Sequence, residues 1–243
     1  MAPYGERSPD EIRALTRAAV ERLFALGCRL VILACNTASA NALRHLQQTW
    51  LPDAHPDRRI LGVLVPMVEA ITGMPWMEDP AHRPAAPAKT VAVFATSRTV
   101  TSNAYPVEIA KRAPEVRVVQ QACPALVELI ENHARREELR AAVGTYAAEM
   151  MAQLGGMPPD AVMLGCTHYP LVADLFAEAL PAGIELLSQP DLVARSLAHY
   201  LERHPEFDAR DGGETRFLTT GDPERVSAVS GLFLGRPVRF ETV

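Results

Sequence analysis

The sequence predicts an α/β fold in which mostly parallel strands are flanked by helices on both faces. Short continuous apolar runs, typical of strands buried on both faces, recur along the chain, and helical patterns fill most of the gaps between them. The chain has 243 residues, 48% hydrophobic and 22% charged, which provides a sizeable core for one large domain or two ordinary ones.

The first predicted element is a helix that begins at a capping box, Ser8-Pro9-Asp10-Glu11, and ends before Gly27. Its inward stripe is expected to run through apolar residues spaced three and four apart: Ile12, Leu15, Ala19, Leu23 and Leu26.

The first strand is predicted at residues 30–33, where four aliphatic residues follow one another. Similar runs predict strands at residues 60–65, 91–95, 116–120, 161–164, 184–187, 216–219 and 238–240. In parallel sheets ligands bind at the carboxyl ends of the strands, so we look for functional residues directly after each run.

Residues 73–89 interrupt this alternation with four prolines and several alanines, which indicates a linker or surface loop. A weaker break lies at Gln189-Pro190. We therefore expect two pseudo-symmetric lobes, with residues 1–88 plus 188–243 in the first, residues 89–187 in the second, and the active site in the cleft between them.

Charge and motifs exclude several classes of function. The formal net charge of −5 argues against nucleic acid as a partner, and no apolar run is long enough to span a membrane. The N-terminus lacks the layout of a secretory signal, which predicts a cytoplasmic protein. No C-x-x-C pair indicates a metal site, and no glycine-rich phosphate loop indicates a nucleotide cofactor.

Two cysteine turns form an internal repeat. Residues 31–37 and 162–168 align without a gap: three aliphatic residues, a small residue, Cys35 or Cys166, and two polar residues that open the next helix. A helix N-terminus favours the thiolate, so we expect both thiols to have a lowered pKa. Cys28 and Cys123 lack this context and are expected to be structural.

Two equivalent thiols suit inversion at a carbon acid. One thiolate removes the α-proton from one face, and a thiol on the opposite face returns a proton to the planar carbanion.

The residues around these cysteines resemble the two signature motifs of the glutamate racemase family, which needs no cofactor. The motifs are Ala34-Cys35-Asn36-Thr37-Ala38 and Leu164-Gly165-Cys166-Thr167-His168-Tyr169-Pro170. The resemblance continues in segments 3–9, 95–100, 122–127 and 217–222, and so spans nearly all of the chain.

The resemblance implies that Cys35 and Cys166 are the two acid/base thiols. It also implies that the amino acid is bound by Tyr4, Gly5, Asn36, Thr37, Thr167 and His168. Backbone amides in these turns and the side chains of Asn36 and Thr167 can hold a carboxylate, and His168 can assist proton transfer at Cys166. Thr96 and Thr99 are further candidate contacts. D-glutamate for peptidoglycan synthesis is the implied product, and a homodimer is an assembly common in the family.

Two departures from the family pattern leave alternatives open. The family begins with a strand that ends in an Asp-Ser pair, whereas this chain starts almost at Pro-Tyr-Gly; we expect a start codon assigned too late rather than a shortened, inactive binding protein. Leu187-Ser188-Gln189 stands where the family usually has a second Asp-Ser pair. A racemase acting on aspartate or another acidic amino acid is the other alternative, because one methylene is worth only about 1–3 kcal/mol of discrimination.

Overall fold

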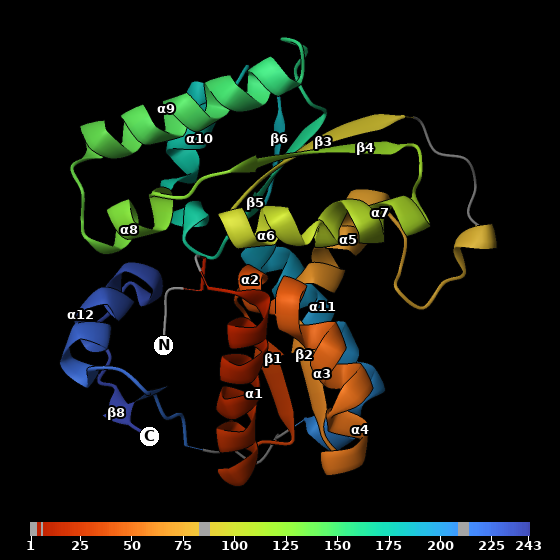
Figure 1. Ribbon diagram of the computed structural model, residues 1–243, viewed down its shortest axis with the longest axis vertical. Helices are drawn as coiled ribbons and strands as arrows, with labels where there is room; N and C mark the ends of the chain where they lie inside the picture. Colours follow the sequence, from red (N-terminus) through yellow and green to blue (C-terminus); the bar gives the residue numbers. More distant parts are fainter. Residues whose placement is uncertain (1–3, 6, 83–87, 209–213) are drawn as a thin grey trace.

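The main sheet of the protein is parallel and four-stranded. The computed structural model describes residues 4–5, 7–82, 88–208 and 214–243, and in it this sheet has the order β4-β3-β5-β6 (Figure 1). Its strands are β3 (Lys89–Ala95), β4 (Val116–Ala122), β5 (Ala161–Gly165) and β6 (Glu185–Leu187). Ala95 of β3 pairs with Ala122 on one side and Gly165 on the other. The residues that follow three of the strands therefore leave the sheet at the same carboxyl edge.

Helices cover both faces of this sheet because alternate strand residues point to opposite sides. Ala92 and Phe94 of β3 belong to one buried cluster, with residues of α8, α9 and α10, whereas Val91 and Val93 belong to a second cluster, with residues of α5 and α7. The helices around the sheet are α5 (Leu64–Thr72), α6 (Ser97–Ser102), α7 (Ala104–Arg112), α8 (Leu126–Glu131), α9 (Arg136–Gln153), η3 (Tyr169–Val172) and α10 (Ala173–Ala179).

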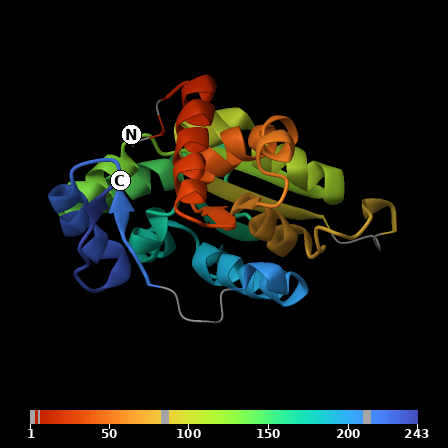
Figure 2. The ribbon, with the colours of Figure 1, turned by 90° about the horizontal axis from the view of Figure 1, so that it is seen from below.

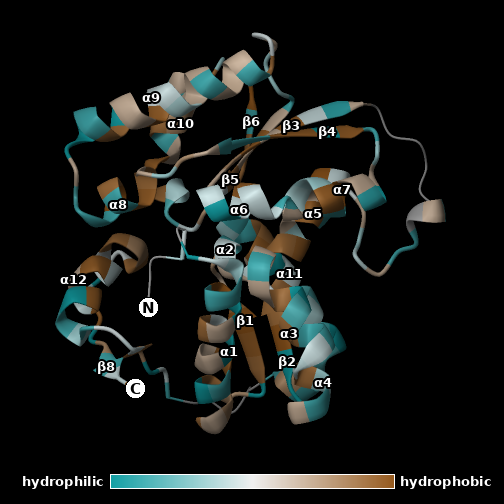
Figure 3. Cartoon of the chain, in the orientation of Figure 1, coloured by the Kyte–Doolittle hydropathy of each residue, from teal (hydrophilic) through white to brown (hydrophobic). Residues whose placement is uncertain are grey.

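A second, two-stranded parallel sheet carries the first cysteine turn. It consists of β1 (Leu30–Leu33) and β2 (Arg59–Gly62), and both strands are largely brown, the hydrophobic end of the scale, in Figure 3. Val31 and Ile60 pack in one buried cluster with Phe24 of the first helix and Leu46 and Trp50 of the following ones. The surrounding helices are α1 (Pro9–Ala25), α2 (Asn36–Ala38), the π-helical η1 (Ser39–Leu43), α3 (Arg44–Thr49) and α4 (Leu51–Ala54).

The chain after β6 forms two separate groups of elements. α11 packs against α5, whereas α12 lies apart from α11 in both views of the ribbon (Figures 1 and 2). Arg22 of α1 donates from Nη1 to the backbone oxygen of Val243 at 3.0 Å, which ties the end of the chain to the first helix. The elements are α11 (Gln189–Arg203), η4 (Pro205–Phe207), β7 (Leu218–Thr219), α12 (Pro223–Leu234) and β8 (Glu241–Thr242).

The predicted start and end of the first helix are confirmed. Ser8 caps the helix, the Glu11 carboxylate accepts a hydrogen bond from the Ser8 amide at 2.9 Å, and Gly27 has φ 95°. The predicted stripe is correct at Ile12, which is fully buried, and at Leu23, which packs on the core, but it is wrong at Leu26, which is 49% exposed. The helix turns a single i, i+4 row toward the core, namely Ile12, Thr16, Val20 and Phe24.

Five of the predicted strands are confirmed to within two residues at either end, namely those at 30–33, 91–95, 116–120, 161–164 and 184–187. The prediction for 60–65 is wrong at its end, because β2 stops at Gly62 and Leu64 already begins α5. The strand predicted at 216–219 is only Leu218–Thr219, and the one predicted at 238–240 lies instead at Glu241–Thr242.

Part of the predicted linker packs on the main sheet's layer of helices. The Arg112 guanidinium of α7 lies 3.8 Å from the ring centre of Trp76, and the Trp76 amide donates to the Glu69 carboxylate at 2.6 Å. Pro84 and Pro87 of this segment, like Pro3 and Glu6 of the N-terminal motif, lie outside the described residues. Among the helices that are described, none is long and apolar enough to cross a membrane.

Candidate active site

The two cysteine turns follow strands of different sheets. Cys35 follows β1 and is the N-cap of α2, with extended backbone angles (φ −74°, ψ 122°) and an exposed side chain. Cys166 follows β5 and is buried, with 6% of its surface exposed. Gly165, the last residue of β5, lets this strand lie close to β3 just before the second turn, because a Cβ at this position would lie 3.2 Å from the Phe94 carbonyl oxygen.

Strand register and one hydroxyl contact bring the two turns together. Gly165 pairs with Ala95 across the sheet, so Cys166 and Thr96 leave neighbouring strands side by side. The Thr96 hydroxyl lies 3.0 Å from that of Thr37, which is two residues after Cys35. The structure therefore places the predicted thiols in one region, and the charge of Cys35 is one of the influences that raise the pKa of Cys166.

The expectation of a lowered pKa is wrong for Cys166. Burial raises the pKa of this thiol to about 12, although hydrogen bonds from the backbone amides of His168 and Tyr169 act in the opposite direction. The helix-start amides that the sequence predicted are present, but the loss of water around the buried sulfur outweighs them. Cys166 is therefore a neutral thiol at neutral pH, which makes it a proton donor.

A histidine lies next to this thiol, and a carboxylate lies next to the histidine. His168 Nδ1 lies 3.7 Å from Cys166 Sγ, and His168 Nε2 lies 2.8 Å from Glu131 Oε1 at the end of α8. The ring of Phe233 from α12 meets the His168 ring edge-on, with 5.1 Å between centroids. Glu131 can hold the imidazole and stabilise its charged form, so the three groups offer a route for a proton away from the sulfur.

Sequence reasoning missed Glu131 because nothing local singles it out. It is one of several acidic residues on helix ends, and it lies 37 residues before His168 in the sequence. The only available signal is structural: α8 starts after β4, whose carboxyl end adjoins that of β3.

The polar residues after Cys35 face inward. Asn36 is 3% exposed, and its side-chain amide is paired with that of Gln189 through two hydrogen bonds of 2.9 Å. The Tyr105 hydroxyl also donates to Asn36 Oδ1 at 2.6 Å. Thr37 is 2% exposed, and its hydroxyl contacts those of Thr96 and, at 3.3 Å, Thr99. The backbone carbonyl of Asn36 accepts from the Ser39 amide, and that of Thr37 accepts from Asn41 Nδ2 at 2.9 Å. One hydrogen of the Asn36 side-chain amide and the backbone N–H groups of Asn36 and Thr37 at the start of α2 are left to bind a ligand.

The remaining predicted residues lie around the same strand ends. Tyr4 is half-buried. Burial raises the pKa of its hydroxyl, and the charge of Cys35 adds a smaller effect in the same direction. Gly5 lies against Thr96, because a Cβ on it would be 3.7 Å from the Thr96 Cβ. Thr167 is exposed and His168 is partly buried. Whether these residues contact substrate stays a prediction.

No metal-binding group is apparent in residues 4–5, 7–82, 88–208 and 214–243, where no three His, Cys, Asp or Glu side chains are arranged to hold an ion. Of the other cysteines, Cys123 follows β4 at the same sheet edge, is fully buried and has a raised pKa because of burial. Its sulfur donates weakly to the Gln121 carbonyl at 3.8 Å, which suits the structural role predicted for it.

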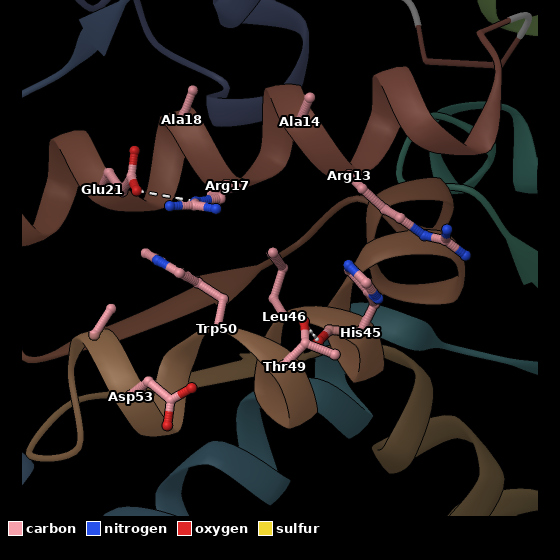
Figure 4. Close-up of a pocket in the computed structure, with 11 residues that line it drawn as sticks. Arg13, Ala14, Arg17, Ala18, Glu21, His45, Leu46, Thr49, Trp50 and Asp53 are labelled. Carbon is pink, nitrogen blue, oxygen red and sulfur yellow. Dashed lines mark hydrogen bonds and ion pairs between the residues drawn. The ribbon is translucent and has the colours of Figure 1, made fainter.

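A hollow of about 720 Å³ lies elsewhere, between α1 and the α3–α4 segment (Figure 4). Its arginines already have partners: Arg17 lies 3.0 Å from Glu21 and 5.0 Å from the Trp50 ring centre, and Arg13 lies 3.1 Å from Asp10. Its lining includes neither thiol. The strand ends therefore hold the better candidate site.

Comparison with known proteins gives a consistent result, although no family model matches the chain. The chain is 52% identical over 241 residues to the glutamate racemase of Paracoccus denitrificans, covering 99% of this chain and 86% of the relative. It is 46% identical over 246 residues to the glutamate racemase of Phenylobacterium zucineum, covering 99% and 87%.

Solved structures agree in fold. Glutamate racemase isoform RacE1 from Bacillus anthracis superposes with a TM-score of 0.81 at 26% identity, covering 100% of this chain and 84% of that one. Glutamate racemase from Francisella tularensis in complex with D-glutamate gives a TM-score of 0.82 at 24% identity, covering 100% and 84%.

Proposed function

This chain belongs to the glutamate racemase family, and from that premise we propose that Cys35 and Cys166 interconvert L- and D-glutamate by proton transfer on opposite faces of the α-carbon. The chain is an amino-acid racemase, an isomerase whose substrate is glutamate.

The observation that carries the proposal is the register that sets the two turns side by side. Cys166 and Thr96 leave paired strands together, and Thr37 connects the Cys35 turn to Thr96 through a 3.0 Å hydroxyl contact. Two thiols held in this way can address the two faces of one bound carbon. We propose two lobes with the bounds expected from the sequence, residues 1–88 plus 188–243 and residues 89–187; the four-stranded sheet lies in the second, and α5 of the first packs on it.

In one direction the steps are as follows. The Cys35 thiolate removes the α-proton, so the C–H pair of electrons remains on the α-carbon and is delocalised into the carboxylate, and the neutral Cys166 thiol donates its proton to the opposite face. Cys35 ends as a thiol and Cys166 as a thiolate. Backbone amides in the turns at Thr37 and Thr167 stabilise the charge that develops on the substrate carboxylate.

In the other direction Cys166 must first lose its proton, which its burial disfavours. His168 accepts that proton at Nδ1, and Glu131, 2.8 Å from Nε2, stabilises the imidazolium. His168 therefore provides a proton acceptor next to the buried thiol, although the charge of Glu131 is also one of the causes that raise the pKa of that thiol.

The proposal extends to the cellular setting. D-glutamate supplies peptidoglycan synthesis, the enzyme works in the cytoplasm, and it does so as a homodimer. All four cysteines are free, and two catalytic thiols need a reducing compartment. Light scattering during size-exclusion chromatography checks the dimer.

The test follows α-proton exchange in deuterated water. Cys35→Ala and Cys166→Ala should each abolish racemisation, and each variant should still exchange the α-proton of a single enantiomer, opposite in the two cases. The matched control is Cys28→Ala, which removes a partly buried thiol outside the site and should leave racemisation unchanged. Exchange that survives in the Cys35→Ala plus Cys166→Ala double variant would contradict the assignment.

A further inference from the structure

The side chain next to Cys35 is held by two buried residues from distant parts of the chain. Asn36 Oδ1 accepts from the Tyr105 hydroxyl at 2.6 Å and from Gln189 Nε2 at 2.9 Å, and Asn36 Nδ2 donates to Gln189 Oε1 at 2.9 Å. Tyr105, Gln189 and Asn36 are 0%, 4% and 3% exposed. Both lone pairs of the Asn36 oxygen are therefore used, in a place that water does not reach.

The partners of Asn36 belong to elements around the main sheet, not to the sheet that carries Cys35. Tyr105 lies near the start of α7, in the buried cluster that includes Met67 of α5 and Met163 of β5, and Gln189 is the first residue of α11. Packing on all sides fixes the tyrosine ring, so its hydroxyl holds the Asn36 side chain in one position. Burial also raises the pKa of Tyr105, and it remains a hydrogen-bond donor throughout the working range of pH.

The Cys35 side chain itself is only weakly constrained by its own contacts. Its side chain is exposed and makes no capping hydrogen bond to α2. The next two residues, by contrast, are both bonded across to the other sheet: Asn36 to Tyr105, and Thr37 to Thr96. The position of the Cys35 sulfur is thus set by what its neighbours bind.

We propose that Tyr105 and Gln189 are positioning residues for racemisation, which act through Asn36 to fix the Cys35 thiol opposite Cys166. The inference rests on the proposed roles of the two thiols. Proton transfer to or from carbon depends steeply on the distance between donor and acceptor, and a displacement of about 1 Å costs about 100-fold in rate.

Two variants remove the hydrogen bonds while keeping the volume of the side chains. Tyr105→Phe deletes the hydroxyl but leaves the buried ring, and Gln189→Leu removes the paired amide. We expect kcat to fall about 10- to 100-fold in each, with KM within about threefold of the parent value, because the substrate contacts themselves are unchanged. Tyr146→Phe is the matched control: its hydroxyl accepts a backbone hydrogen bond from Ala125 at 3.3 Å and is not bonded to Asn36, so kcat should not change.

Deuterium effects separate positioning from loss of folded enzyme. With glutamate deuterated at the α-carbon, the primary isotope effect should rise in Tyr105→Phe and Gln189→Leu only for the enantiomer that Cys35 deprotonates. That enantiomer is identified as the one whose α-proton the Cys166→Ala variant still exchanges. Partial unfolding lowers the concentration of active enzyme and so reduces both directions without changing either isotope effect.

The outcomes are distinguishable from those of the function test. If Cys35→Ala and Cys166→Ala stop racemisation but Tyr105→Phe and Gln189→Leu keep the parent kcat and isotope effects, the positioning role is wrong and the thiol assignment stands. A fall in kcat with unchanged isotope effects for both enantiomers also overturns it. If the double cysteine variant still exchanges the α-proton, the function proposal itself fails.

Discussion

The unequal burial of the two thiols predicts very different rates of alkylation. Cys35 is exposed, whereas Cys166 is 6% exposed and its pKa is raised by burial from 9.0 to about 12. The thiolate is the species that iodoacetamide attacks. At pH 8 about one Cys166 in 10⁴ is ionised, against about one in ten for a thiol with the ordinary pKa, so its reaction should be about 10³-fold slower before steric protection is counted.

The assay is a time course of alkylation at pH 8, with each cysteine followed by mass spectrometry of its peptide. In the folded protein Cys35 should be alkylated before Cys166. The rate of alkylation of Cys166 should rise about tenfold for each pH unit up to about pH 11. In urea all four cysteines should react at similar rates, which serves as the control.

Glutamate provides a second control, because substrate bound between the thiols should protect Cys35 in the folded protein. Modification of Cys166 at pH 8 within about tenfold of the rate seen in urea would refute the reasoning, since neither the raised pKa nor the burial could then hold.

Three further predictions concern the same structure. Glu131→Gln removes a charged partner 2.8 Å from His168, worth about 1.5–3 kcal/mol, and should lower kcat at least about tenfold for the enantiomer that Cys166 deprotonates. Because kcat/KM must stay equal for the two enantiomers, the KM of that enantiomer should fall relative to the other; kcat values equal to those of the parent for both enantiomers would contradict this. Gly62→Ala places a Cβ 2.6 Å from a leucine side chain and should lower the free energy of unfolding by about 1–3 kcal/mol in urea titrations, whereas Gly144→Ala, where space is open in a helix, should raise it. Between pH 9 and about 12 the folded protein keeps the Cys166 proton while the unfolded chain loses it, so the contribution of this thiol to stability is complete below pH 9 and falls as pH rises. Between pH 8 and 10.5 the free energy of unfolding should therefore fall by about 2 kcal/mol more in the parent than in Cys166→Ser. Equal decreases in the two proteins would contradict this.

The sequence predicts best where burial is complete. The runs at 91–95 and 161–164 are apolar because both faces of β3 and β5 are covered, and a strand covered on both sides leaves that signature. The run at 60–65 is equally apolar, but it crosses a turn into α5, and hydrophobicity alone does not mark where the backbone changes. The predicted stripe of α1 is partly wrong for a related reason, because several leucines compete for a face that tertiary packing selects.

At the site, the sequence predicts where the turns lie but not how deeply their side chains are buried. It places Cys166 at a strand end with helix-start amides, yet the sign of its pKa shift depends on burial, which no local pattern reveals. Glu131, Tyr105 and Gln189 reach the site from 37, 69 and 153 residues away from their partners, so only the fold shows the contact.

The two thiols differ in burial, although the reaction that they catalyse has an equilibrium constant of one. Mirror-image amino acids have the same free energy in water, so kcat/KM must be equal for the two enantiomers whatever the enzyme does. The different surroundings of Cys35 and Cys166 must then be expressed as opposite changes in turnover and saturation: the enantiomer that is processed more slowly at high concentration is also the one that saturates the protein sooner.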